Sequence, residues 1–321
     1  MSIAPGFVDR PADPGRDLDG VAALLEASDR DLYGEAESSR PFVEHGWRTS
    51  SFDLSSVTRV VWDDVRIVAY AEVEALDPSV SLHGWVVVHP ERRGRGLGST
   101  LADWVQRVAI DAAPDGESVL FHHTIPAPDL GAREIVHRRG LRHVNTSWHM
   151  RRVLDDAFEP GPTPEGVTIR PSRSGDDDVA IHDILMRAFE GSFGWSFVPL
   201  DRFWRDARGD PDFASDWVLV AEQGGEVVGV SWQWNQDPVG WVGELGVRPD
   251  LQGRGIGRAL LQHALADLAR RGFPIAQLNV DSQNDFGAVD LYRSVGMEVV
   301  REYRHLEKPI VGAGVLRPRS G

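Results

Sequence analysis

Alternating and periodic apolar positions divide the second half of the chain into short, regular elements. Residues 217–222 form an apolar, β-branched run typical of a strand, and Gly224-Gly225 indicates a hairpin turn after it. Residues 227–234 and 241–247 predict two further strands. The pattern therefore begins with three successive strands.

From residue 256 the apolar period changes to that of a helix. The apolar residues at helical spacing are Ile256, Leu260, Leu261, Ala264, Leu265 and Leu268. Gly272 ends this run, residues 275–281 predict another strand, and a second helix through Tyr292 ends at Gly296. This order predicts a compact α/β domain with a mixed sheet.

The same motifs occur twice along the chain. Residues 7–11 resemble residues 167–171, and residues 86–98 resemble residues 245–257, at offsets of about 160 positions. A weaker third match joins residues 135–141 to residues 291–297. Three matches in the same order at a nearly constant offset predict two copies of one domain.

The predicted domains are residues 1–154 and residues 167–310. Between them, residues 155–166 carry three prolines and no helical or strand period, which predicts an exposed linker. Residues 311–321 are rich in Gly, Pro and Arg and predict a flexible tail.

In each copy a strand ends at a proline, and a turn of glycines and arginines then opens a helix. The first turn comprises Arg93, Gly94, Arg95, Gly96, Leu97 and Gly98; the second comprises Gln252, Gly253, Arg254, Gly255, Ile256, Gly257 and Arg258. Glycines let the backbone approach a ligand, and the free N–H groups of a helix start favour phosphate. Neither turn has the lysine of a Walker loop, and neither fits the dinucleotide fingerprint. The alternative is a glycine-rich helix entry that holds no ligand.

Both turns fit the pattern [Gln/Arg]-x-x-Gly-x-[Gly/Ala], and here the chain resembles the GCN5-related N-acetyltransferase (GNAT) family. Members of this family hold the pyrophosphate of coenzyme A in this turn. The resemblance covers nearly the whole chain and implies two tandem GNAT domains with a mixed α/β fold. It also implies that main-chain groups of Leu245, Gly246 and Val247 pair with the pantetheine arm, as would those of Val86, Val87 and Val88 in the first copy.

The second copy alone carries the family's downstream tyrosine, at Tyr292. The resemblance implies that this phenol protonates the departing thiolate, whereas the alternative is a half-buried core tyrosine. Asn284 is expected either to contact pantetheine or to cap the following helix. Val136 stands in the first copy where Tyr292 stands in the second. Since valine cannot donate a proton, we expect the first domain to be catalytically inactive.

The general base is expected to be Glu244, just before the pantetheine strand. Strict strand alternation places its side chain on the face opposite to those of Leu245 and Val247. The family usually carries a bulge in this strand, which the sequence does not reveal. A surface or ion-paired role for Glu244 is the alternative.

Tryptophans cluster where the family binds its acceptor. Trp195, Trp232, Trp234 and Trp241 are candidate substrate-binding residues, with Trp232 and Trp234 on one face of a strand. The alternative is ordinary core packing.

Composition narrows the function classes. The chain has 321 residues, 41% hydrophobic and 26% charged, without an apolar run of membrane-spanning length or a signal-peptide pattern, so a cytoplasmic protein is expected. A formal charge of −15 argues against nucleic acid as a partner. The absence of cysteine excludes a thiol nucleophile and thiolate metal sites, and the histidines lack metal-ligand spacing, so no metal is expected.

The predicted function is acetyl transfer from acetyl-CoA, as co-substrate, to a primary amine of a small molecule by direct attack in the second domain. A monomer or homodimer is expected, without membrane or nucleic-acid partners. Two alternatives stay open. One is acetylation of a cysteinyl pseudo-disaccharide, as in some tandem members, although those members carry a glutamate near the position of Trp241. The other is a non-catalytic acyl-CoA sensor.

Overall fold

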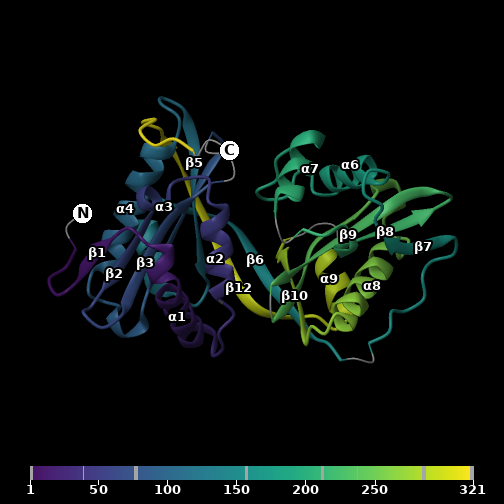
Figure 1. The fold of residues 1–321 in the computed structure, drawn as a ribbon, viewed down its shortest axis with the longest axis horizontal. Coiled ribbons are helices and arrows are strands. Elements are labelled where there is room, and N and C mark those ends of the chain that lie inside the picture. Colours follow the sequence, from purple (N-terminus) through teal and green to yellow (C-terminus); the bar gives the residue numbers. More distant parts are fainter. Residues whose placement is uncertain are drawn as a thin grey trace. The chain divides into compact units, whose positions relative to one another are not determined.

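A computed structural model describes residues 3–38, 40–75, 79–155, 158–210, 213–236, 238–283 and 287–318. The chain forms two compact units (Figure 1). One comprises Met1–Thr146 with Arg301–Gly321, and the other Ser147–Val300.

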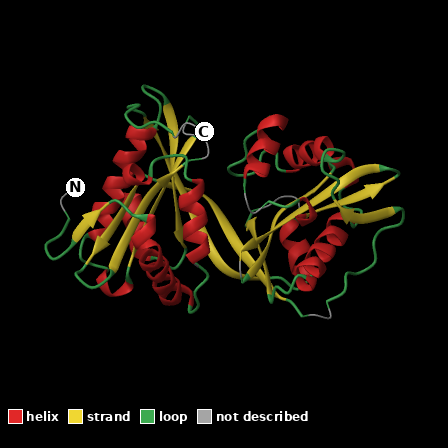
Figure 2. Cartoon of the chain, in the orientation of Figure 1, coloured by secondary structure: helices red, strands yellow, loops and turns green. Residues whose placement is uncertain are grey.

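The first unit is a mixed sheet covered by helices on both faces (Figure 2). Its strands, in spatial order, are β1 (Val8–Arg10), β2 (Thr58–Trp62), β3 (Ile67–Glu74), β4 (Ser81–Val88), β5 (Ser118–Pro126) and part of β12 (Glu298–Val311). Its helices are α1 (Pro14–Tyr33), α2 (Arg40–Thr49), α3 (Leu54–Val57), α4 (Leu97–Ala112) and α5 (Leu130–Arg138). Only β4 and β5 are parallel to each other among these neighbours. α1 and α2 bury one face of the sheet, and α4 buries the other.

The second unit repeats this plan. Its strands, in spatial order, are β7 (Val167–Pro171), β8 (Val218–Gln223), β9 (Glu226–Gln236), β10 (Val239–Val247), β11 (Ile275–Asp281) and part of β6 (Arg142–Val153). Its helices are α6 (Asp178–Ala188), α7 (Leu200–Gly209), α8 (Ile256–Arg270) and α9 (Ala288–Ser294). α6 and α7 pack on one face of the sheet, and α8 and α9 pack on the other (Figure 1). The mixed α/β fold and the tandem repeat are thereby confirmed.

Local sequence signals explain most element boundaries. Gly224 and Gly225 both have positive φ and join β8 to β9, which confirms the predicted hairpin. The strand predicted at 275–281 is β11, with the same limits. Gly296, also at positive φ, follows α9 closely, as predicted.

Each repeat also carries the same ion pair at its start. Arg10 binds Asp17 and Arg170 binds Asp177, with closest N–O distances of 2.5 and 2.6 Å. Each aspartate also accepts a backbone N–H four residues before it, so the pair fixes the entry into the first helix of each unit. This repeated contact is structural.

Each unit completes its sheet with a strand from the other repeat. Residues 147–153 of β6 pair antiparallel with β11, and residues 303–311 of β12 pair antiparallel with β5. The two compact units therefore divide at Thr146 and Val300.

The predicted flexible tail is hydrogen-bonded where the structure describes it. The N–H groups of Gly312, Ala313 and Gly314 donate to carbonyl oxygens of Glu117, Ile110 and Ala113. Partly buried Leu316 packs against the first unit's core. Among the described residues, no helix is both long and apolar enough to cross a membrane.

Candidate functional site

The parallel strands β10 and β11 stay paired over only part of their length. Their pairing ends at Trp241 and Gln277, yet β10 continues to Val247 and β11 to Asp281. The edge of β10 beyond Trp241 thus presents main-chain N–H and C=O groups that are not hydrogen-bonded to β11. A peptide-like chain could pair with these groups in a strand-like manner.

A β-bulge lies in β10 where this separation begins. The register with β9 shifts between Val242 and Glu244, which leaves Gly243 as the extra residue. The bulge precedes Glu244, so Glu244 still alternates with Leu245. It does place Glu244 opposite Trp232, on the face that Trp241 shares. The opposite orientation of the Glu244 and Leu245 side chains does not obstruct strand-like pairing with β10. The main-chain groups that would pair lie in the plane of the sheet, and the side chains lie on either side of it.

Glu244 and Tyr292 lie close together at this opening. Burial raises the pKa of the Glu244 carboxyl to about 7. Burial, and then the charge of Glu244, raises the pKa of the Tyr292 phenol to about 12. At neutral pH the carboxyl can accept a proton while the phenol still holds one, which is the charge state required of a base and an acid.

Val136 and Tyr292 occupy equivalent positions in the two units. The carbonyl oxygen of Tyr292 accepts the N–H of Met297 beyond the end of α9, and that of Val136 accepts the N–H of Leu141 beyond α5. Val136 is 3% exposed within the apolar core of the first unit. The predicted alignment of these two residues is therefore confirmed.

The second turn has the geometry of an anion cradle. Gly253 and Gly255 have φ of 74° and 84°, in the region that favours glycine, and Gly255 is the N-cap of α8, which has no side-chain cap. The first N–H groups of α8 therefore have no side chain of this turn bound to them. The Gln252 amide donates to the carbonyl oxygen of Val247 at 3.3 Å and ties the turn to β10.

The first turn has nearly the same backbone. Gly94 and Gly96 have φ of 76° and 83°, and α4 also starts without a side-chain cap. Its arginine differs from Gln252 because the Arg93 guanidinium binds the carboxylate of Asp31 in α1. The same backbone geometry is thus present in both units, with different side chains at the first position of the turn.

Some predicted turn residues contribute packing. Leu97 and Ile256 are buried and anchor the first turns of α4 and α8. The Arg254 guanidinium donates to the carbonyl oxygen of Asp250 at 3.3 Å. Asn284 lies outside the described residues. Within the described part of the chain, no group of three or more acidic or histidine side chains could hold a metal ion.

The first unit contains a buried carboxyl that sequence reasoning missed. Glu72 lies opposite Trp85 across β3 and β4, whereas Glu244 lies opposite Trp232 across β9 and β10. Trp85 precedes Val86 as Glu244 precedes Leu245, so the two units carry Glu and Trp in exchanged positions. Burial raises the pKa of Glu72 to about 8.

Glu72 is hydrogen-bonded within its core. The Tyr70 hydroxyl donates to Glu72 at 2.5 Å and accepts from the Trp47 indole at 2.7 Å. The strand alternation of residues 67–74 would have placed Tyr70 and Glu72 on one face.

The four candidate tryptophans separate into different environments. Trp232 stacks on Trp204 of α7 at 5.8 Å and is part of the packing under that helix. Trp234 and Trp241 form a directly opposed cross-strand pair, with ring centroids 6.4 Å apart and planes at 18°. Trp195 lies in the loop after α6, and its buried indole N–H has no hydrogen-bond partner.

A histidine that the sequence did not suggest joins this aromatic pair. His149 of β6 lies opposite Asn279, and its ring meets that of Trp241 edge to face at 5.5 Å. Since β6 comes from the first repeat, only the strand exchange brings His149 into the second unit.

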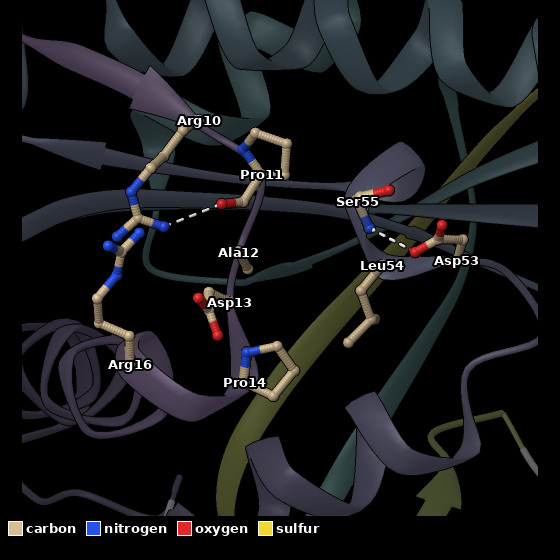
Figure 3. Close-up of a pocket in the computed structure, with 9 residues that line it drawn as sticks. All are labelled: Arg10, Pro11, Ala12, Asp13, Pro14, Arg16, Asp53, Leu54 and Ser55. Carbon is tan, nitrogen blue, oxygen red and sulfur yellow. Dashed lines mark hydrogen bonds between the residues drawn. The ribbon is translucent and has the colours of Figure 1, made fainter.

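A surface pocket of about 440 Å³ lies elsewhere, in the first unit (Figure 3). It is lined by the starts of α1 and α3, including Arg10, Asp13 and Asp53. Asp13 and Asp53 cap these helices with their own side chains, and Arg10 is bound to Asp17. None of the predicted site residues lines this pocket.

Known proteins match both repeats of the chain. The family model described as acetyltransferase (GNAT) family matches residues 21–140 and again residues 179–297. A mycothiol acetyltransferase of Thermobispora bispora is 32% identical over 297 residues, covering 88% of this chain and 92% of that protein. One of Streptomyces bingchenggensis is 35% identical and covers 72% and 74%.

Solved structures agree with the tandem arrangement. A GCN5-related N-acetyltransferase from Sphaerobacter thermophilus superimposes with a TM-score of 0.81 and 30% identity, covering 97% of this chain and 98% of that one. A tandem GNAT protein from the clavulanic acid biosynthesis pathway gives a TM-score of 0.72 at 15% identity, covering 94% and 98%.

Proposed function

The chain belongs to the acetyltransferase (GNAT) family and is an acetyl-CoA-dependent N-acetyltransferase, and we propose that its second unit acetylates a primary amine of a small molecule. In this proposal Glu244 is the base and Tyr292 the acid. The observation that carries it is that Glu244 lies near enough to the Tyr292 phenol for its charge to act on it, beside the point where β10 and β11 stop pairing.

The proposed reaction is direct attack. Glu244 takes a proton from the acceptor ammonium, and the free amine attacks the thioester carbonyl carbon, so that a C–N bond forms. The C–S bond then breaks, and the Tyr292 hydroxyl gives its proton to the departing thiolate. The amine nitrogen gives a second proton to water as the amide forms, and water returns one proton to the Tyr292 phenolate. No acyl-enzyme is required.

The second turn supports this assignment because its backbone is open to a phosphate ligand. A Cβ added at Gly253 would meet nothing within 4 Å, so the space beside the turn is free. Main-chain N–H groups of Gly253, Gly255 and the first turn of α8 are suited to the pyrophosphate. Main-chain groups of Leu245 and Val247 are suited to the pantetheine amides.

The first unit is proposed to be catalytically inactive. Val136 replaces the tyrosine, and Trp85 stands where the second unit has Glu244. Its turn keeps the geometry for acetyl-CoA, so binding without turnover is the role that fits these residues.

A second candidate acceptor comes from the relatives. Proteins named mycothiol acetyltransferase match this chain over most of its length, which favours the cysteinyl pseudo-disaccharide. Against it stands Trp241, where the resemblance led us to expect a carboxylate.

Thiol release from acetyl-CoA with a panel of primary amines tests the proposal. Tyr292→Phe should lower kcat by about 100-fold or more while leaving KM for acetyl-CoA unchanged. Tyr33→Phe is the matched control, because it removes a tyrosine hydroxyl that binds the Glu302 carbonyl oxygen in the first unit. Unchanged kcat in Tyr292→Phe would refute the acid role, and the absence of any acceptor-dependent release would favour the sensor alternative.

A further inference from the structure

Three aromatic side chains form a continuous row over β9, β10 and β6 beside the proposed reaction site. We call Trp234, Trp241 and His149 the aromatic wall. Its two indoles are nearly parallel at 18°, and the imidazole stands against Trp241 at 81°. Strands from both repeats contribute to the wall, all within the second unit.

The wall lies where an acceptor must approach. Trp241 is the last residue of β10 paired with β11, so it stands where the two strands separate. Glu244 follows on the same face of β10 after the bulge. The indole of Trp234 crosses the bulge itself, since a Cβ at Gly243 would fall 1.7 Å from its ring. An amine within reach of Glu244 therefore carries the rest of its molecule past these rings.

The wall keeps apolar surface open to ligands. This open surface belongs to Trp234, which is 37% exposed, whereas Trp241 is 8% exposed and lies against it. The residues of β11 beside the wall are Gln277 and Asn279, which are uncharged amides. Burying the exposed ring surface contributes roughly 25 cal/mol per Å² of apolar area, and a stacked aromatic partner contributes more.

The chemistry of Glu244 favours an acceptor whose remaining part, beyond the reacting amine, is neutral and not cationic. Burial alone raises the pKa of this carboxyl to about 7. A second ammonium held on the indoles nearby would lower that pKa and weaken the base, because an opposite charge favours the ionised carboxylate. A planar apolar body excludes water and leaves the base intact.

We propose that the acceptor is a primary amine joined by a short linker to a planar aromatic ring, and that the exposed face of Trp234, supported from behind by the buried Trp241, determines this specificity. The ring stacks on the aromatic wall while the amine reaches Glu244. This inference rests on the proposed acetyl transfer in the second unit and specifies its substrate class.

Four primary amines that differ in the group attached to the amine test the proposed substrate class with the full-length protein. They are 2-phenylethylamine, hexylamine, 1,5-diaminopentane and glucosamine. We expect kcat/KM for 2-phenylethylamine to exceed each of the others by about 10-fold or more. Equal or higher values for glucosamine or 1,5-diaminopentane would overturn the proposal in favour of a sugar or polycation acceptor.

A matched pair of variants then tests the wall. Trp234→Leu should raise KM for 2-phenylethylamine by about 10-fold and leave KM for acetyl-CoA and for hexylamine nearly unchanged. Trp217→Phe is the control, since this indole packs on Phe273 and Arg271 outside the wall. An equal loss for all amines in Trp234→Leu would mark a structural role and overturn the proposal.

Calorimetric binding separates this inference from the catalytic assignment. The affinity for 2-phenylethylamine is measured with Tyr292→Phe protein saturated with coenzyme A, so that no turnover is needed. Binding that is lost on adding Trp234→Leu supports the wall even if Tyr292 proves not to be the acid. No binding by any aromatic amine overturns the wall, whatever the role of Tyr292.

Discussion

Burial, and then the charge of Glu244, holds the phenol of Tyr292 in its protonated form with a pKa of about 12, while burial raises the pKa of Glu244 itself to about 7. The two groups come from different elements, β10 and α9, and Glu244 follows directly after the bulge at Gly243. Their opposite protonation states at neutral pH suit a proton relay in which one accepts and the other donates.

The pH dependence of kcat/KM should show this relay. Activity should rise with pH through about 7, since Glu244 must lose its proton to act as base, and Tyr292 should stay protonated far above that range. Glu244→Gln should abolish this rise of activity with pH (the acidic limb of the pH profile) and lower kcat by about 100-fold. Initial rates at saturating acetyl-CoA from pH 5 to 9 measure both effects.

Two controls keep this assignment specific. Glu72→Gln alters another buried glutamate, whose pKa is raised to about 8, but in the first unit, so the activity profile should not change. Two acceptors of different amine pKa distinguish ionisation of the enzyme from that of the acceptor. A limb that moves with the acceptor, or that survives in Glu244→Gln, contradicts the base role.

Gly243 and Trp234 should be coupled. A Cβ at Gly243 would lie 1.7 Å from the Trp234 ring, so Gly243→Ala must displace the indole or the bulge. We expect kcat/KM for the acceptor to fall by about 10-fold or more. Trp234→Ala in the same chain removes the clash, and the double variant should recover much of kcat while KM for aromatic acceptors stays high. Strict additivity of the two losses in a double-mutant cycle would show that the clash does not govern the site.

The two phosphate turns offer a symmetric experiment. Gly96 and Gly255 have φ of 83° and 84°, so alanine at either position costs roughly 1–2 kcal/mol of backbone strain. Both variants should lose similar stability in thermal unfolding. Only Gly255→Ala should raise KM for acetyl-CoA, by about 10-fold, because only the second unit is proposed to turn over. A matching rise in Gly96→Ala would assign turnover to the first unit as well.

Local signals made much of this fold predictable from sequence. The strand at 275–281, the Gly224-Gly225 hairpin and the helix end before Gly296 each depend on neighbouring residues alone, and each appears as predicted. The glycine at 243 inside a strand was also a signal for the bulge, since such a glycine often marks one.

Non-local features were beyond that reach. β6 and β12 each end a repeat, and each could pair with the sheet of either repeat. Nothing in their own residues distinguishes pairing with the other repeat from pairing within the same repeat. His149 belongs to the proposed acceptor site only through that exchange. The buried carboxyl of Glu72 is likewise recognised as the counterpart of Glu244 only from its pairing with Trp85 on the next strand.

The exchange of strands predicts that neither repeat folds when the chain is cut between them. A fragment of residues 1–154 would leave the edge of β5 without residues 303–311 of β12, and would carry β6 without β11. An open apolar edge of this kind favours aggregation. We expect this fragment to be insoluble or to lack a cooperative thermal transition.

A rewired fragment provides the decisive comparison. Residues 1–146 joined by a flexible glycine-serine linker to residues 301–316 restore the β5–β12 pairing and the hydrogen bonds of Gly312 and Gly314 to the first unit. This version should be soluble and unfold cooperatively in circular dichroism, although it has almost the same length as the simple fragment. If residues 1–154 fold as well as the rewired chain, the strand contributed by β12 is dispensable, and the exchange does not determine how the first unit folds.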